Sequence, residues 1–116
     1  MGTSFHPITL LHNGASETIE ALVDTGSTFT TVPAAVLERL GIQPHRTIPL
    51  RLANGQINDR QIGRVMAQLD GVEEEILCVF GGPADLPIIG AHTLEAFLLG
   101  VDPDRQRLVP VEGWWA

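Results

Sequence analysis

Apolar and polar residues alternate with a period of two over much of the chain, the pattern of half-buried β-strands. In the segment 17–23, for example, Ile19, Ala21 and Val23 fall on one face. Similar runs predict strands over residues 5–11, 17–23, 28–32, 47–52, 62–69, 74–80 and 107–111. The pattern therefore predicts a mostly β protein.

Asparagine–glycine and aspartate–glycine pairs separate several of these strands. Asn13-Gly14, Asn54-Gly55 and Asp70-Gly71 each follow one apolar run and precede another. Such pairs favour tight hairpin turns because both residues tolerate positive φ. They predict three β-hairpins.

Two short segments have helical spacing instead. Val36, Leu37 and Leu40 form one apolar stripe, with Pro33 suited to the first helical position and Gly41 to the end. A second stripe predicts a helix over 91–99, through Leu94, Phe97 and Leu98.

The chain also contains an internal sequence repeat. Leu40-Gly41-Ile42-Gln43-Pro44 is matched by Leu99-Gly100-Val101-Asp102-Pro103, and an apolar strand ending in glycine precedes each helix. This predicts two strand–turn–helix units related by a pseudo-two-fold axis; chance similarity of two short helices is the alternative.

Composition and charge limit the class of protein and its possible partners. With 116 residues, 44% hydrophobic and 18% charged, the chain suits a single globular domain over 1–116. A net charge of −7 argues against nucleic acid or an anionic membrane as a partner. No span-length apolar run or signal-peptide pattern is visible, so the expected location is the cytoplasm.

The cysteine and the histidines give no sign of a metal or redox site. Cys78 is the only cysteine, so no intrachain disulfide can form, and its apolar neighbours predict a buried thiol rather than a reactive one. The histidines lack metal-ligand spacing, and neither a metal nor a cofactor is expected; they are His6, His12, His45 and His92.

Candidate chemistry lies in the stretch 21–28. A buried strand ends there in Asp24, followed by Thr25, Gly26 and Ser27. Hydroxyl groups beside a carboxylate suit a hydrogen-bonded cradle, and glycine permits a turn or a close backbone approach. The simpler interpretation is an ordinary turn after a strand, because Asp and Gly are common in turns.

These residues together resemble the retropepsin-like aspartic proteases. The matching features are the motif at 23–27, the segment 86–90 before a short helix, and between them a hairpin with glycine near its tip at 52–56. The resemblance covers about residues 19–103. It implies a closed, retropepsin-like β-barrel with two short helices and a flap hairpin, acting as a homodimer on peptide or protein substrates.

The resemblance also implies roles for individual residues. Asp24 of each subunit would activate water, because two adjacent carboxylates share one proton. Thr25 would bond across the dimer axis, Gly26 would permit the close approach, and Ser27 would donate to Asp24. Substrate would meet three further residues, Asn54 and Gly55 at the flap tip and Ile88.

The sequence departs from retroviral members in two places. Ala91 and His92 follow Gly90 where those members have an arginine that supports the dimer, and Thr28-Phe29-Thr30 replaces a stretch containing acids. His92 is expected to be exposed and Phe29 to be in the core. Trp114 and Trp115 are expected to be covered by a partner subunit, and packing on their own domain is the alternative. A catalytically inactive dimerisation or peptide-binding module, or an unrelated β domain, are the alternative interpretations.

Overall fold

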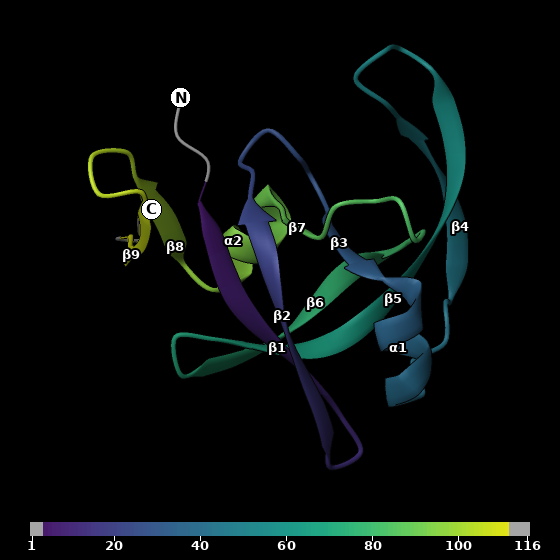
Figure 1. Cartoon of the computed structure of the whole chain (residues 1–116), viewed down its shortest axis with the longest axis horizontal. Helices are drawn as coiled ribbons and strands as arrows, with labels where there is room; N and C mark the ends of the chain where they lie inside the picture. Colours follow the sequence, from purple (N-terminus) through teal and green to yellow (C-terminus); the bar gives the residue numbers. More distant parts are fainter. Residues whose placement is uncertain (1–3, 112–116) are drawn as a thin grey trace, which may run out of the picture.

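The computed structural model of the chain describes residues 4–111 (Figure 1). Its elements, in order, are β1 (Phe5–His12), β2 (Ala15–Val23), β3 (Thr30–Pro33), α1 (Ala34–Leu40), β4 (Arg46–Arg51), β5 (Ile57–Leu69), β6 (Val72–Gly81), β7 (Ile88–Ile89), α2 (Ala91–Ala96), β8 (Leu99–Asp102) and β9 (Arg107–Pro110). Neither described helix has the length and apolarity needed to cross a membrane.

The strands form a sheet that closes on itself. Its order is β1-β2-β7-β3-β6-β5-β4, and β1 also pairs with β5, so that all but β4 lie in a ring. The β8–β9 hairpin forms a separate small sheet. The predicted mostly β, closed fold with two short helices is confirmed.

The ring has an internal two-fold pattern. The β1–β2 and β5–β6 hairpins are equivalent, β3 runs parallel to β6, and β7 runs parallel to β2. The equivalent strands β3 and β7 also pair with each other, antiparallel, at Thr31 and Ile88. A short helix follows each of these two strands, so the topology confirms a two-fold repeat. The strand directly before α1 is β3, which ends in Pro33, so the predicted match between a strand ending in Gly26 and one ending in Gly90 is wrong.

The sequence match between residues 40–44 and 99–103 does not correspond to equivalent positions in the structure. Gly41 ends α1 in the left-handed conformation, with φ 82°. Gly100 instead lies within β8, and the left-handed residue after α2 is Leu98, with φ 55°. The second predicted helix is confirmed but ends earlier than residue 99: α2 spans Ala91–Ala96, because the chain reverses at Leu98 and a strand that was not predicted starts at Leu99.

Other element ends also differ from the prediction. Pro33 is the last residue of β3, paired with Gly81, and has ψ 131°, which is not helical. β3 begins at Thr30 rather than at residue 28, and β5 begins at Ile57 rather than at residue 62. β5 is longer because its first residues pair with β4, and a polar sequence on an exposed hairpin gives no apolar alternation.

Two hairpins turn as predicted and the third turns differently. Asn13-Gly14 and Asp70-Gly71 have positive φ at both residues, as two-residue turns require. The β4–β5 hairpin is confirmed, but its turn is longer, with the Leu52 N–H donating to the Gln56 carbonyl at 2.7 Å.

The core fills the ring and the space beneath both helices. Its side chains come from alternate positions of the strands and from the helix stripes, and include Ile8, Leu10, Ala21, Val32, Leu37, Val65, Ala67, Leu69, Ile76, Ile89 and Leu94. Cys78 is fully buried among them, and desolvation raises the pKa of its thiol to about 12. The prediction of a buried thiol is confirmed.

Candidate functional site

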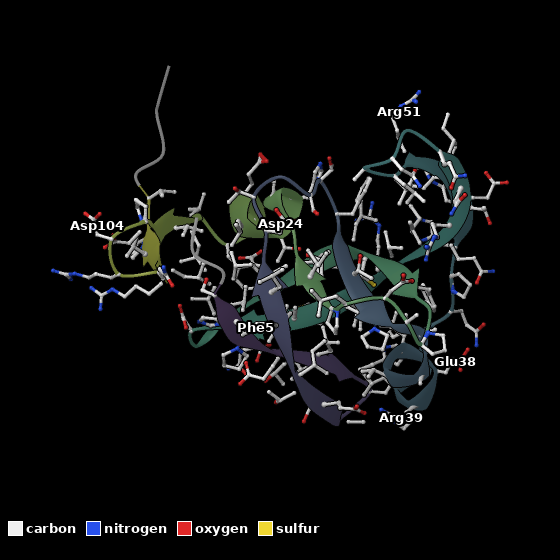
Figure 2. The ribbon with its side chains drawn as sticks, turned by 45° about the horizontal axis from the view of Figure 1, so that its top comes forward. Phe5, Asp24, Glu38, Arg39, Arg51 and Asp104 are labelled. Carbon is white, nitrogen blue, oxygen red and sulfur yellow. The ribbon has the colours of Figure 1, made fainter. Side chains whose placement is uncertain are left out.

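Asp24 follows the last residue of β2, where that strand lies against β7. Its backbone N–H donates to the Ile89 carbonyl at 3.0 Å, which continues the β2–β7 pairing by one residue. In Figure 2 Asp24 lies at the upper surface of the ring, on the same side as the β4–β5 hairpin. The strand pairing therefore fixes where the carboxylate leaves the core.

The residues after Asp24 orient its carboxylate. The Gly26 N–H donates to Oδ1 at 2.9 Å and the Ser27 hydroxyl donates to Oδ2 at 3.1 Å. The Ser27 N–H also donates to the Asp24 carbonyl at 3.1 Å, which closes the turn. Each carboxylate oxygen thus has a donor, and Asp24 is half-buried with one side open to a cleft. Thr25 is exposed and lines a separate cavity of about 300 Å³ on the other side of Asp24.

The first turn of α2 forms backbone hydrogen bonds with the loop that follows Asp24. The Ala91 N–H donates to the Ser27 carbonyl at 2.7 Å, and the His92 N–H donates to the Thr28 carbonyl at 3.0 Å. Free N–H groups at a helix start need acceptors, and the loop supplies them. The position of Asp24 therefore depends on a helix more than sixty residues away.

A buried polar contact strengthens the same junction. The Thr30 hydroxyl accepts a hydrogen bond from the Gly90 N–H at 3.1 Å and bonds to the Thr93 hydroxyl. Both threonines are 1% exposed. Because the hydroxyls satisfy each other and a backbone donor, they can be buried here without unpaired polar groups.

Phe29 does not enter the core. It is half-buried, lines the cleft and stacks on His92, with ring centroids 5.7 Å apart. The prediction of a core position is wrong, because the loop's bonds to α2 turn residues 28 and 29 outward. His92 is exposed, as predicted.

The cleft lies between the Asp24 loop and the β4–β5 hairpin and has a volume of about 620 Å³. Its lining residues are Asp24, Gly26, Ser27, Thr28, Phe29, Thr31, Val79 and the four hairpin residues 50–53. Asp24 is the only acidic side chain among them.

The predicted binding residues lie in different places. Ile88 lines an adjoining pocket of about 190 Å³, together with Leu50 and Leu52. Asn54 and Gly55 are exposed at the turn and line neither cavity, and the Asn54 carboxamide accepts from the Gln56 N–H at 2.9 Å. Leu50 and Arg51 were missed by the sequence interpretation, which included Leu52 and Ala53 only as part of the flap hairpin. The alternation of Ile48, Leu50 and Leu52 was the signal that this face of the hairpin turns inward.

Arg60 and Asp85 form an ion pair at the edge of the 190 Å³ pocket, with 2.7 Å between Nη1 and Oδ2. The Gly82 N–H donates to the same oxygen at 2.7 Å. The Arg60 hydrogen bond and then the Gly82 N–H hold the pKa of the Asp85 carboxyl below its usual value.

Asp85→Asn should lower the free energy of unfolding by about 1 kcal/mol near neutral pH, since the pair is partly exposed. Because the folded pKa is the lower one, this contribution is complete above the unfolded pKa of about 3.9 and disappears as pH falls through the folded pKa. Urea unfolding of both proteins from neutral pH to about pH 2 would test this. The difference should shrink on acidification, whereas the exposed Asp59→Asn control should differ little from wild type at any pH; a pH-independent difference would contradict the ionic origin.

Within residues 4–111, no three His, Cys, Asp or Glu side chains lie close enough together to hold a metal ion.

Comparisons with known proteins agree with this architecture. The family model described as "gag-polyprotein putative aspartyl protease" matches residues 8–102. Comparison with curated proteins gave no match.

Three solved structures share the fold. The simian foamy virus (mac) protease has 20% identity and a TM-score of 0.58, covering 79% of this chain and 92% of its own. The protease of EIAV, solved with the inhibitor HBY-793, has 16% identity and a TM-score of 0.58, covering 83% and 88%. A retropepsin-like aspartic protease from Rickettsia conorii has 20% identity and a TM-score of 0.53, covering 90% of each chain.

Proposed function

Because the chain belongs to the gag-polyprotein aspartyl protease family, we propose that it is an aspartic endopeptidase that hydrolyses peptide bonds as a homodimer. The observation that carries the proposal is Asp24, an oriented carboxylate at the floor of a cleft whose lining has no second acid. Aspartic protease chemistry uses two carboxylates. The second one would be Asp24 of the partner subunit.

In this mechanism the two carboxylates hold one proton between them, because like charges so close cannot both be ionised. The ionised carboxylate takes a proton from water as the water oxygen attacks the peptide carbonyl carbon. The other carboxylate gives its proton to the carbonyl oxygen. As the C–N bond breaks, the protonated carboxylic acid gives its proton to the leaving amine nitrogen. The ionised carboxylate takes a proton from one hydroxyl of the tetrahedral intermediate, so that the product is a carboxylic acid and the pair is again singly protonated.

The neighbours of Asp24 would serve this step. The donors from Gly26 and Ser27 would keep both carboxylates in fixed orientations, so that little reorganisation is needed during reaction. Thr25, which is exposed next to Asp24, would contact its counterpart across the dimer axis.

The β4–β5 hairpin would act as the flap. Its residues 50–53 already face the cleft, so they would cover a bound peptide and exclude water. Asn54 and Gly55 would reach the substrate or the partner's flap only if the turn moves inward. Ile88 would contact a substrate side chain in the smaller pocket.

The dimer contact would have to form without the arginine of the retroviral enzymes, since Ala91 and His92 follow Gly90. The proposed part of Trp114 and Trp115 in that contact falls outside the described residues 4–111.

We expect purified protein to cleave members of a diverse peptide mixture between about pH 4 and pH 7, with a rate that falls on both sides of an optimum. The rate per protomer should fall on dilution, over the concentration range where sedimentation shows the dimer dissociating. A dilution-independent rate from a monomer would contradict the shared site. A folded dimer that binds peptides and never cuts them would favour the inactive binding module.

A further inference from the structure

The β4–β5 hairpin extends beyond the body of the protein (Figure 1). Its ladder runs from the Arg51–Ile57 pair down to the Arg46–Ile62 pair, and β5 begins to pair with β6 only at Ile62. Residues 47–61 therefore have strand partners only within the hairpin, among the residues that the structure describes. Strand pairing therefore does not attach these residues to the body of the protein.

Arg60 lies on β5, two residues before the pairing with β6 begins at Ile62. Its ion pair with Asp85 connects the hairpin to the body. Over residues 4–111, it is the only side-chain hydrogen bond or ion pair recorded between residues 47–61 and the rest of the chain. The two side chains are 28% and 34% exposed, so water screens the pair only in part.

Asp85 is well placed to anchor the hairpin. It lies in the turn between β6 and β7, where its own N–H donates to the Gly82 carbonyl at 3.0 Å while its carboxylate accepts from the Gly82 N–H. Two hydrogen bonds between Asp85 and Gly82 therefore stabilise the turn that carries the carboxylate.

Both members of the pair also line the 190 Å³ pocket. Its hairpin wall is Leu50 and Leu52, and its body wall includes Val79 and Ile88. The width of the pocket therefore depends on how closely the hairpin approaches the body, and the ion pair joins the two at the edge of the pocket.

We propose that Arg60 and Asp85 form a latch that holds the flap hairpin against the body and thereby sets the width of the pocket beside Ile88. They are positioning residues, which act on substrate through Leu50 and Leu52. The inference rests on the proposed function for its consequence in catalysis, but the latch itself is a property of the folded chain. A latched hairpin would bind substrate with less loss of conformational freedom than a mobile one.

The first test is independent of activity. In methyl NMR spectra, cross-peaks between the Leu50 or Leu52 methyl groups and those of Val79 or Ile88 report closure of the pocket. Arg60→Gln should weaken them at least about threefold relative to cross-peaks between Val65 and Ile76, paired strands of the body. The charge-swapped pair Arg60→Asp with Asp85→Arg should restore part of the intensity.

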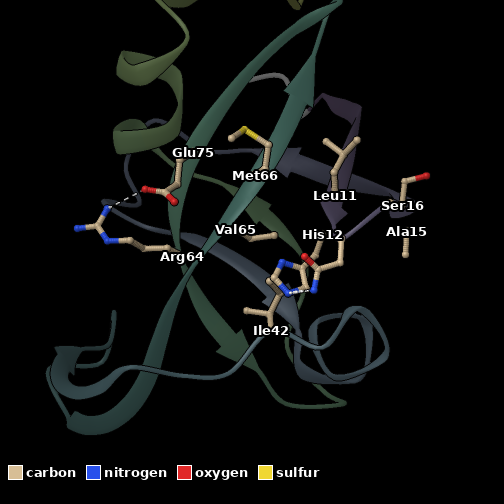
Figure 3. Close-up of a pocket in the computed structure, with 11 residues that line it drawn as sticks. Leu11, His12, Ala15, Ser16, Ile42, Arg64, Val65, Met66 and Glu75 are labelled. Atoms are coloured by element: carbon tan, nitrogen blue, oxygen red, sulfur yellow. Dashed lines mark hydrogen bonds and ion pairs between the residues drawn. The ribbon is translucent and has the colours of Figure 1, made fainter.

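Arg64→Gln is the matched control. Arg64 lies on the same strand and pairs with Glu75 at 3.8 Å, but it lines a different cavity of about 470 Å³, next to the β1–β2 turn (Figure 3). That turn is at the opposite end of β2 from Asp24. This variant should leave the Leu50 and Leu52 cross-peaks unchanged. Equal intensities in Arg60→Gln and wild type would overturn the latch.

The second test uses cleavage. Arg60→Gln should raise KM roughly fivefold, the effect of a partly exposed charged pair of about 1 kcal/mol, and leave kcat nearly unchanged. Arg60→Lys should recover part of the loss. A fall in kcat with KM unchanged would contradict a positioning role. If no variant and no wild type cleaves, the proposed function fails, while the NMR result still decides the latch.

Discussion

Replacing Asp24 by asparagine should reduce peptide cleavage at least about a thousandfold without unfolding the protein. Asparagine has nearly the same shape, and its carbonyl oxygen can still accept the Gly26 N–H that now bonds to Oδ1. It can neither take a proton from water nor share one with a second carboxylate, and loss of general acid–base catalysis alone removes about 10²–10⁴-fold. Initial rates on one cleaved peptide, with sedimentation of both proteins, measure the effect.

The control is the same substitution at Asp104, an exposed acid in the turn between β8 and β9 (Figure 2). Asp104→Asn should cleave at a rate close to that of wild type. Activity of Asp24→Asn within about tenfold of wild type would place the chemistry elsewhere.

Dimers of one wild-type and one Asp24→Asn subunit would test whether both carboxylates are needed. Adding excess Asp24→Asn protein to a fixed amount of wild type would convert most wild-type subunits into dimers with a single Asp24 carboxylate. If both carboxylates are needed, activity should fall with the added variant roughly as the fraction of wild-type dimers falls. Activity that stays constant would show that each subunit works alone.

The parts of the fold that the sequence predicted are those specified by neighbouring residues. Asn13-Gly14 and Asp70-Gly71 form their turns because the conformation each needs is local to two residues. The apolar face of residues 65, 67 and 69 is buried because alternation along a strand is also local. The acid at the end of β2 could be singled out because its own segment supplies hydroxyl groups and a glycine beside the carboxylate.

What the sequence did not predict depends on contacts distant in the chain. Phe29 faces the cleft because α2 binds the carbonyls of the loop beside it, which no local pattern reveals. The strand at Leu99 forms through pairing with β9, although its residues also suit the end of a helix. Leu50 and Arg51 became candidates only when the fold placed them in the lining of the same cleft as Asp24.

Gly90→Ala should lower the free energy of unfolding by about 3 kcal/mol or more. A Cβ at residue 90 would lie 2.6 Å from the Phe29 carbonyl carbon and 2.8 Å from the Ser27 carbonyl oxygen, and would also overlap the Phe29 oxygen. Those are backbone atoms, so no side chain can rotate away, and overpacking of this kind costs about 1–3 kcal/mol or more. The Ser27 carbonyl is also held by the Ala91 N–H. Urea unfolding of both proteins measures the change.

Activity should fall further than the unfolded fraction accounts for, because the residues that must shift are those that hold Asp24. The matched control is Gly82→Ala, whose Cβ would meet only the Asp85 Oδ2, at 3.4 Å, an ordinary contact. Gly90 has an extended backbone, with φ −94° and ψ 178°, which any residue adopts. If only Gly90→Ala lowers the free energy of unfolding, the cause is the lack of space between α2 and the Asp24 loop. If both variants lower it equally, the cause is a general cost of replacing glycine. A neutral Gly90→Ala would mean that this junction is looser than its hydrogen bonds imply, and that Asp24 is positioned mainly by β2 and its own turn.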